Sequence, residues 1–378
     1  MKNKILLLYL NTGGGHLAPA KAVANSLTKN FGNDIEPILI NGFEKTASWV
    51  KLICEDGYRY AQNNAKWVYE LIYGINKINL FAKTSLNIAS RHSKKYLREV
   101  ILKENPQKII IFHFFLIQPV TEILKELKLT IPVLTMVTDP FSPSPVWFYN
   151  KQMQYIISND EIFKNSLVKG IDASNFHYLP FPLNEKFSQE LTLDEKKYLK
   201  QALGFDENKK LVLVIGGADG IAKGKKIVKH VIKQNPDANV AIVCGRNNKL
   251  FAKVMNYKID HQLHNLTIFS YVSFVFELLN ISDLVITKGG TSTIMEILAS
   301  KNIPVISDYL WEQEKGNVDF VVNKNVGIYE TKPKRIGKIV HNLLNNETSL
   351  KLIKESQTKI NIENGSDKIS KFVYEYCA

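Results

Sequence analysis

The sequence predicts an α/β protein built from two doubly wound parallel-sheet domains that face each other across a cleft. Short runs of Val, Ile and Leu alternate with amphipathic segments along the chain, which is typical of buried parallel strands joined by helical crossovers. The alternation restarts after a proline-containing stretch at 177–187, and each half opens with a strand that runs into glycines. The chain of 378 residues is also long for one core, which favours two domains.

Each half contributes five candidate strands. They are 5–10, 35–40, 108–113, 132–137 and 154–157 in the first half, and 211–215, 238–243, 266–269, 283–287 and 304–307 in the second. Pro180 and Pro182 stiffen the stretch between the halves, as expected of a linker. We expect an N-terminal domain over residues 1–183 and a C-terminal domain over residues 184–378, with the last helix packing back on the N-terminal domain.

One segment, at 43–98, interrupts the alternation with long helical patterning and no clear strand. It carries ten basic and four acidic residues, together with Trp49 and Trp67. Aromatic and basic side chains on helices are typical of contacts with a membrane interface. A helical insertion whose aromatic side chains form a core is the alternative.

Composition narrows the class of protein. The net charge of +13 at pH 7 suggests an anionic partner, either nucleic acid or a membrane surface, although the codon usage of an AT-rich genome would have the same effect. The three cysteines lack CxxC spacing, which argues against a disulfide framework or a zinc site and fits a reducing cytoplasm. We expect neither a signal peptide nor a membrane-spanning segment.

The first candidate site is the run "LYLNTGGGH", which ends at His16. Glycines let the backbone turn tightly beside a substrate, and a helix that begins here points free N–H groups at an anion. Histidine titrates near neutrality and suits a general base that takes a proton from a hydroxyl. A glycine-rich turn with a solvent-exposed histidine is the alternative.

The second candidate site is "ITKGGTSTIMEIL", in which Gly289 and Gly290 separate a strand from a helix. The helix N-terminus suits a phosphate, and Glu296 is placed to accept hydrogen bonds from ribose hydroxyls. The alternative is a capping box made by Thr293 and Glu296 without any ligand.

Polar residues follow other strands as well: Arg246 in "CGRNNKL", Gln313 and Glu314 in "DYLWEQEKGN", and Asp139 and Trp147 in "VTDPFSPSPVWFY". The sequence contains neither a GxGxxG fingerprint nor a P-loop, which argues against ATP hydrolysis. It also lacks DxD and HExxH motifs, so we expect no metal in the site.

These motifs, in this order, resemble glycosyltransferase family 28 of the GT-B architecture, in particular the monogalactosyldiacylglycerol synthases and processive diacylglycerol glucosyltransferases. The resemblance implies two facing Rossmann-like domains and the transfer of galactose or glucose from UDP-galactose or UDP-glucose to diacylglycerol. It implies no cofactor, no metal and no nucleic acid, and a cytoplasmic enzyme peripheral to the inner face of the cell membrane, where the surface is anionic. A lipid II-type N-acetylglucosaminyltransferase and a non-catalytic nucleotide- or lipid-binding protein are the alternatives.

The resemblance also implies roles for individual residues. His16 would be the general base, with Asp139 as a second catalytic residue and Gly14 and Gly15 shaping the pocket. The remaining implied roles are as follows: Gly216, Gly217, Gly290 and Thr293 at the diphosphate, Arg246 at the nucleotide, the backbone of Tyr271 and Val272 at uracil, Glu296 at the ribose, Gln313 and Glu314 at the sugar, and Trp49, Trp67 and Trp147 at the acceptor or membrane.

Two departures from the family pattern motivate the non-catalytic alternative. Ser144 stands where the first-domain loop usually has a histidine, and Ser292 stands where the "GPGT" motif has its second glycine.

Overall fold

The computed structural model describes residues 2–11, 14–45, 79–160, 162 and 170–376. It divides into two compact units, of which unit 1 holds residues Met1–Glu185 and Asn364–Ala378 and unit 2 holds Lys186–Glu363. The division falls two residues after the boundary expected at 183, and the C-terminal helix belongs to unit 1. Trp49 and Trp67 lie outside the described residues.

Unit 1 is built on a six-stranded parallel sheet in the order β2-β1-β3-β4-β5-β6. The strands are β1 (Asn3–Tyr9), β2 (Ile35–Asn41), β3 (Lys108–Ile111), β4 (Val133–Met136), β5 (Gln154–Ile157) and β6 (Phe176–Tyr178). The five predicted strands are confirmed. The sixth, β6, has three residues and lies where the sequence predicted the start of a linker.

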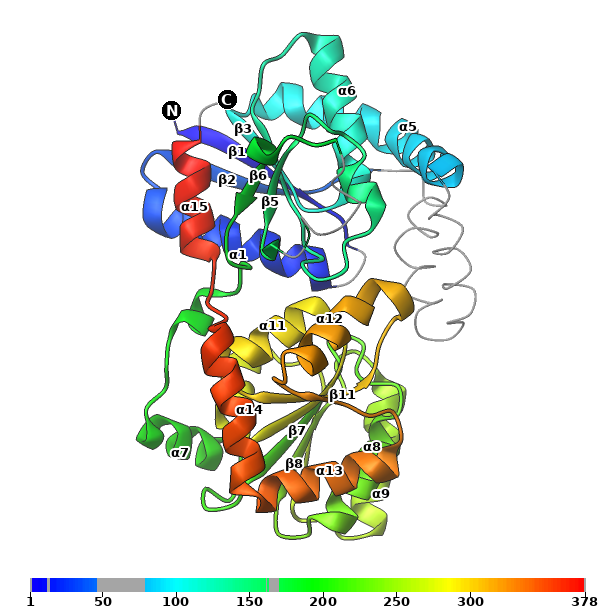
Figure 1. The fold of residues 1–378 in the computed structure, drawn as a ribbon, viewed down its shortest axis with the longest axis vertical. Helices are drawn as coiled ribbons and strands as arrows, with labels where there is room; N and C mark the ends of the chain where they lie inside the picture. The colour runs from blue at the N-terminus through cyan, green and yellow to red at the C-terminus, as the bar shows by residue number, and fades with distance from the viewer. Residues whose placement is uncertain (1, 12–13, 46–78, 161, 163–169, 377–378) are drawn as a thin grey trace. The chain divides into compact units, whose positions relative to one another are not determined.

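Helices cover the sheet of unit 1 (Figure 1). They are α1 (Gly14–Phe31), α5 (Asn79–Glu104), α6 (Ile117–Leu127) and α15 (Ser366–Glu375). Leu97 of α5 and Val120 of α6 share a core with Leu6 and Ile109 of the sheet. The C-terminal α15 packs against α1, where the Ser26 hydroxyl donates to the Asp367 carboxylate at 2.6 Å. No described helix is both long and apolar enough to span a membrane.

Unit 2 is built on a second six-stranded parallel sheet, in the order β12-β11-β10-β7-β8-β9. Its strands are β7 (Leu211–Ile215), β8 (Asn239–Val243), β9 (Leu266–Phe269), β10 (Leu284–Lys288), β11 (Ile303–Asp308) and β12 (Ile328–Tyr329). The five predicted strands are again confirmed, and only the two-residue β12 was not predicted.

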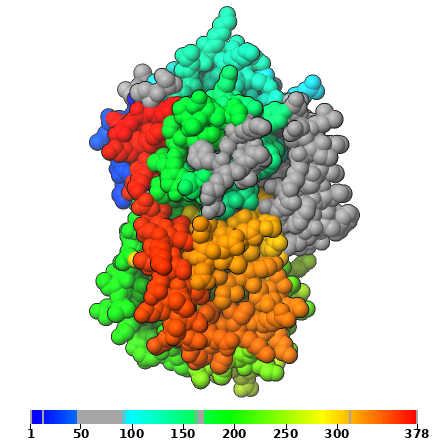
Figure 2. All heavy atoms as spheres, viewed as in Figure 1, coloured from blue at the N-terminus to red at the C-terminus, as the bar shows by residue number. Residues whose placement is uncertain are grey.

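The helices of unit 2 form a layer on each face of this sheet. On one face, α8 (Gly224–Gln234), α9 (Asn248–Asp260), α13 (Pro333–Asn345) and α14 (Glu347–Ile360) share one core. On the other face, α7 (Leu193–Ala202), α10 (Val275–Ile281) and α11 (Thr291–Ala299) share another. Helix α12 (Trp311–Asn323) packs on α11. The outer side of α14, in red-orange, lies on the visible surface of unit 2 (Figure 2).

Candidate active site

The first candidate site lies in unit 1 at the carboxyl ends of three neighbouring strands, β1, β3 and β4. His16 is the third residue of α1, which follows β1, and His113 lies just beyond β3. Thr138 and Asp139 lie just beyond β4. Because the carboxyl ends of parallel strands meet at one edge of a sheet, these residues from distant parts of the chain come together.

His16 is held from several sides. Its Nδ1 lies 2.6 Å from the Thr138 hydroxyl, and its ring centroid lies 4.4 Å from that of His113. Only 7% of His16 is exposed, so the alternative of a solvent-exposed histidine is wrong. Burial lowers the pKa of His16 below its ordinary value, and the Asp139 carboxylate and a hydrogen bond to the Phe112 backbone offset part of that effect. The His16 ring is therefore neutral near pH 7, and Thr138 fixes its orientation.

Asp139 is also buried and accepts a hydrogen bond from Trp147 Nε1 at 2.9 Å. Burial raises the pKa of Asp139, while His16 and the indole N–H oppose the shift. The Trp147 ring is fully buried. Burial of the ring argues against direct contact of Trp147 with a membrane, and its indole N–H holds Asp139. That Trp147 lies at the acceptor stays a prediction.

The strand predicted at 108–113 ends at His113, which adds a second imidazole to this cluster. Its Nδ1 accepts the Phe115 backbone N–H at 3.2 Å, so the neutral ring carries its proton on Nε2. Burial and the neighbouring His16 hold the pKa of His113 well below its ordinary value. His113 is therefore uncharged near pH 7.

Gly14 and Gly15 begin α1 beside this cluster. A Cβ atom built on either glycine meets no described atom within 4 Å. The two glycine positions therefore face open space among the described residues, while His16 of the same turn is buried. The first N–H groups of α1 have no partner within the helix.

The second candidate site lies in unit 2, where glycines follow both β7 and β10. These two strands are neighbours in the sheet. Gly216 and Gly217 follow β7, and a Cβ on Gly216 would lie 2.2 Å from the Gly220 carbonyl oxygen. Gly217 has φ +73°, in the left-handed region that glycine tolerates best. The tight turn of this loop therefore requires glycine.

Gly290 is the N-cap residue of α11 and supplies no side-chain cap. The capping-box alternative is therefore wrong, because Gly290 is the N-cap residue and both Thr293 and Glu296 lie inside α11. The first N–H groups of α11 have no partner within the helix, and the helix dipole favours an anion there.

Lys288 is a residue of this site that sequence reasoning missed. Its Cε lies 3.8 Å from the position of a Cβ on Gly217 and 3.7 Å from that on Gly290. The lysine is half-buried, and the structure gives it no ion pair among the described residues. A cation therefore reaches the space between the two glycine turns.

Glu296 is half-buried one turn further along α11, and burial raises its pKa to about 7. Glu314 of α12 accepts the Leu310 backbone N–H through Oε2 at 2.6 Å, and its Oε1 lies 3.6 Å from the Cβ position of Gly290. Asn317 of α12 donates to the Gly289 carbonyl at 2.7 Å. Two carboxyl groups and an anchored turn thus surround the start of α11.

Arg246 follows β8, and its guanidinium lies 5.5 Å from the centre of the exposed Tyr271 ring, which follows β9. The Arg246 backbone N–H donates to the Ala218 carbonyl at 2.7 Å, which ties it to the loop after β7. Val272 packs into the core below. A cation and an aromatic face therefore lie at the same edge of the sheet as the glycine turns.

Family models match both units of the chain. The model of monogalactosyldiacylglycerol (MGDG) synthase matches residues 16–182, and the model of the glycosyltransferase family 28 C-terminal domain matches residues 211–371. The chain belongs to glycosyltransferase family 28.

Curated relatives agree with the two models. The chain is 27% identical to the chloroplastic monogalactosyldiacylglycerol synthase of Spinacia oleracea, over 89% of this chain and 65% of that protein. It is 26% identical to the processive diacylglycerol beta-glucosyltransferase of Bacillus pumilus, over 98% of this chain and 94% of that protein. The glycosyltransferase chain thus spans just under two thirds of the spinach protein.

Solved structures show the same fold. Acinetobacter baumannii MurG matches with a TM-score of 0.60 and 14% identity over 99% of this chain and 100% of that chain. Anabaena Alr3699/HepE in complex with UDP-glucose matches with a TM-score of 0.56 and 12% identity over 98% and 99%. The expected GT-B fold with Rossmann-like domains is confirmed for this glycosyltransferase.

The predicted site residues of the glycosyltransferase fall into two groups. His16, Asp139 and Trp147 come together with Gly14 and Gly15 in unit 1. The donor-site residues of unit 2 all lie on segments that follow strands β7 to β11: Gly216, Gly217, Arg246, Tyr271, Val272, Gly290, Thr293, Glu296, Gln313 and Glu314.

Proposed function

We propose that this protein transfers galactose or glucose from a UDP-sugar to diacylglycerol and so makes a glycoglycerolipid. The observation that carries the proposal is the Bacillus pumilus relative, named a processive diacylglycerol beta-glucosyltransferase, which aligns with 98% of this chain. Unit 2 supports the same proposal with a site suited to a sugar nucleotide, and unit 1 supports it with a buried neutral histidine. The protein would work as a peripheral enzyme at the cytoplasmic face of an anionic membrane.

Unit 2 would bind the donor. The glycine turns after β7 and β10 leave room for the diphosphate, and the N-terminal N–H groups of α11 would hold its oxygens. Lys288 would add a positive charge to the same phosphates. Glu296 would accept hydrogen bonds from the ribose, Arg246 and the Tyr271–Val272 backbone would contact the nucleotide, and Gln313 and Glu314 would contact the sugar.

The reaction needs a base for the acceptor and stabilisation for the leaving group. The acceptor hydroxyl oxygen attacks the anomeric carbon, its proton passes to His16, and the bond from that carbon to the β-phosphate oxygen breaks. The negative charge that develops on UDP falls on the α11 N-terminus and Lys288, which are already oriented towards it. The Asp139 carboxylate stabilises the imidazolium that forms, and Thr138 keeps the ring oriented.

The test supplies diacylglycerol in neutral detergent micelles with radiolabelled UDP-glucose or UDP-galactose and separates the lipid products by thin-layer chromatography. We expect label in a glycolipid with one or both donors. Label only in a polyprenyl-pyrophosphate muropeptide, supplied with UDP-N-acetylglucosamine in a parallel reaction, would favour the lipid II-type alternative. UDP binding without label in any acceptor would favour the non-catalytic alternative.

A further inference from the structure

Helices α8 and α13 lie side by side on one face of the unit 2 sheet, where both contribute to one core (Figure 1). Their packing is close, because a Cβ on Gly337 would lie 2.6 Å from the His230 carbonyl oxygen. Ile227, Val231 and Val340 are buried beneath them. The inner sides of these two helices are therefore committed to the core, and their outer sides face solvent.

Every charged side chain on the outer sides of α8 and α13 is basic. Neither helix contains an Asp or a Glu. We call the exposed basic side chains of these two helices the basic face: Lys225, Lys226, Lys229, Lys233, Lys334, Arg335 and Lys338. On the opposite side of the same sheet, α10 and α11 each carry one Glu and no Lys or Arg. The third helix on that side, α7, carries three lysines beside Asp194 and Glu195, a net charge of +1. Helices α8 and α13 carry seven basic and no acidic residues, so the positive charge that no acidic residue of the same helix offsets lies on their side of unit 2.

The basic face has few acidic partners within the described chain. The described residues give it one ion pair, between Arg335 and Glu330 at 3.6 Å. Neither α8 nor α13 contributes a large exposed hydrophobic side chain. Such a surface attracts a polyanion through charge and has nothing to insert into an apolar layer.

We propose that the basic face docks unit 2 on an anionic lipid bilayer. The choice of a bilayer over another polyanion rests on the proposed function, because diacylglycerol resides in a membrane. Helices α8 and α13 also contain no Phe, Tyr or Trp, the rings on which bases commonly stack in single-strand binding proteins. This contact uses no residue of the 43–98 segment, so the chain would bind anionic lipid through unit 2 as well.

The test measures co-sedimentation of the full chain with vesicles of phosphatidylcholine alone or of phosphatidylcholine and phosphatidylglycerol in equal parts. The variant combines Lys226→Ala, Lys229→Ala and Lys338→Ala. Each lysine near an anionic surface contributes about fivefold to partitioning, so we expect this variant to bind the anionic vesicles about tenfold to a hundredfold more weakly. Raising NaCl from about 0.1 M to about 1 M should abolish most of the wild-type binding, because the screening length falls from about 10 Å to about 3 Å.

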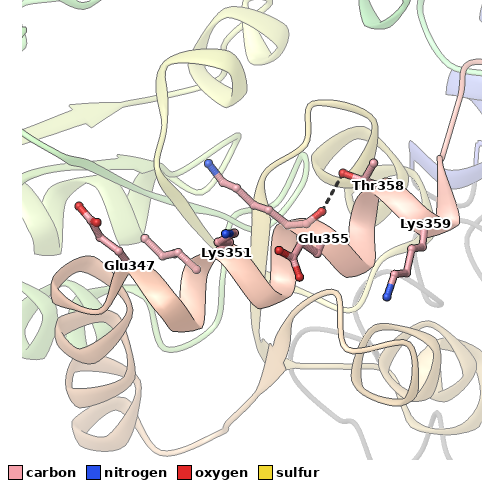
Figure 3. A pocket seen from close by; sticks show the side chains of 7 residues that line it. Glu347, Lys351, Glu355, Thr358 and Lys359 are labelled. Atoms are coloured by element: carbon pink, nitrogen blue, oxygen red, sulfur yellow. Dashed lines mark hydrogen bonds between the residues drawn. The ribbon is translucent and has the colours of Figure 1, made fainter.

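Helix α14 supplies the matched control. Its outer side carries three lysines interspersed with Glu347 and Glu355, and Thr358 donates to the Lys354 carbonyl at 2.9 Å (Figure 3). A variant with Lys351→Ala, Lys354→Ala and Lys359→Ala removes the same charge from the same unit. The three lysines and two glutamates leave α14 a net charge of +1, so we expect its outer side to contact the bilayer less closely than the basic face does. The control should therefore bind anionic vesicles at least about threefold more tightly than the basic-face variant.

Three results would overturn the proposal. The first is an equal loss of vesicle binding in the basic-face variant and the α14 control. The second is wild-type binding to phosphatidylcholine vesicles that is as tight as binding to anionic ones. The third is wild-type binding to single-stranded RNA that is tighter than binding to anionic vesicles. Transferase activity in neutral micelles tests the proposed function independently of binding to an anionic bilayer. A basic-face variant that keeps transferase activity in micelles while losing vesicle binding supports both proposals, and an inactive wild type that binds anionic vesicles overturns only the first.

Discussion

The two candidate sites differ in the groups that form them, which are mainly side chains in unit 1 and mainly backbone in unit 2. In unit 1, buried side chains make the site: the His16 ring is fixed by Thr138, and Asp139 is fixed by Trp147. In unit 2, backbone makes most of the site, through glycine turns and the N-terminus of α11, and Lys288 adds a cation beside both glycine turns.

This difference suits the two tasks that the proposed reaction sets. Proton transfer needs a group whose pKa and orientation are fixed, which burial among side chains provides. Diphosphate binding needs several donors at short range with little steric bulk, which glycine turns and a helix N-terminus provide. Substitutions in unit 1 should therefore act on the chemical step, and substitutions in unit 2 should act on the donor and the leaving group.

The largest effect is expected for His16→Ala. Loss of the general base should lower kcat about 10²- to 10⁴-fold, while UDP affinity, measured by calorimetry, should stay within about twofold because unit 2 is untouched. His341→Ala removes an exposed histidine from α13 and is the control. Transfer by His16→Ala at the wild-type rate would end the assignment of His16 as the base.

A smaller effect is expected for Lys288→Met, which keeps the length of the side chain and removes its charge. A charge-assisted contact to phosphate contributes about 1.5–3 kcal/mol, so kcat/KM should fall about tenfold to a hundredfold. Lys288→Arg should recover part of the loss because it restores the charge. Lys315→Met is the matched control, since Lys315 is an exposed lysine that pairs with Asp319 on α12. Equal losses in Lys288→Met and Lys315→Met would contradict a role at the diphosphate.

The sequence predicted the elements that bury continuous apolar runs and missed those that do not. The strands at 211–215 and 239–243 are buried along their whole length, and such runs are readable without any tertiary information. Strands β6 and β12 have three and two residues and are only partly buried. Pairing with a neighbouring strand forms them, and the local sequence carries no signal for it.

The same reasoning separates the site residues that were predicted from those that were missed. Glycines after a strand are visible in a sequence because few other residues allow such turns. Thr138 and Lys288 are ordinary residues at strand ends, and only the order of strands in each sheet brings them beside His16 and Gly217. The available signal was their position at the end of a strand that neighbours a glycine-bearing one.

The smallest effect is expected at Glu296, where side-chain chemistry enters the backbone-built site. Its pKa of about 7 means that the carboxyl gains its charge as the pH rises through neutrality. An ionised carboxylate accepts hydrogen bonds from ribose hydroxyls better than a protonated one. UDP affinity of the wild type should therefore improve about threefold between about pH 6 and pH 8 relative to Glu296→Gln, since comparing the two proteins cancels the titration of UDP itself.

Without ligand, Glu296 affects the free energy of unfolding in the opposite direction: UDP affinity rises with pH, and stability falls. Because the pKa of Glu296 is raised from 4.5 to about 7 by folding, the folded chain binds more protons than the unfolded chain between these values, so stability falls as the pH rises through this window. Glu296→Gln should remove that part of the slope, as thermal unfolding at a series of pH values would show. Glu355→Gln, on the exposed side of α14, is the control and should leave both profiles unchanged. Parallel pH profiles of UDP affinity for the wild type and Glu296→Gln would place the ribose elsewhere.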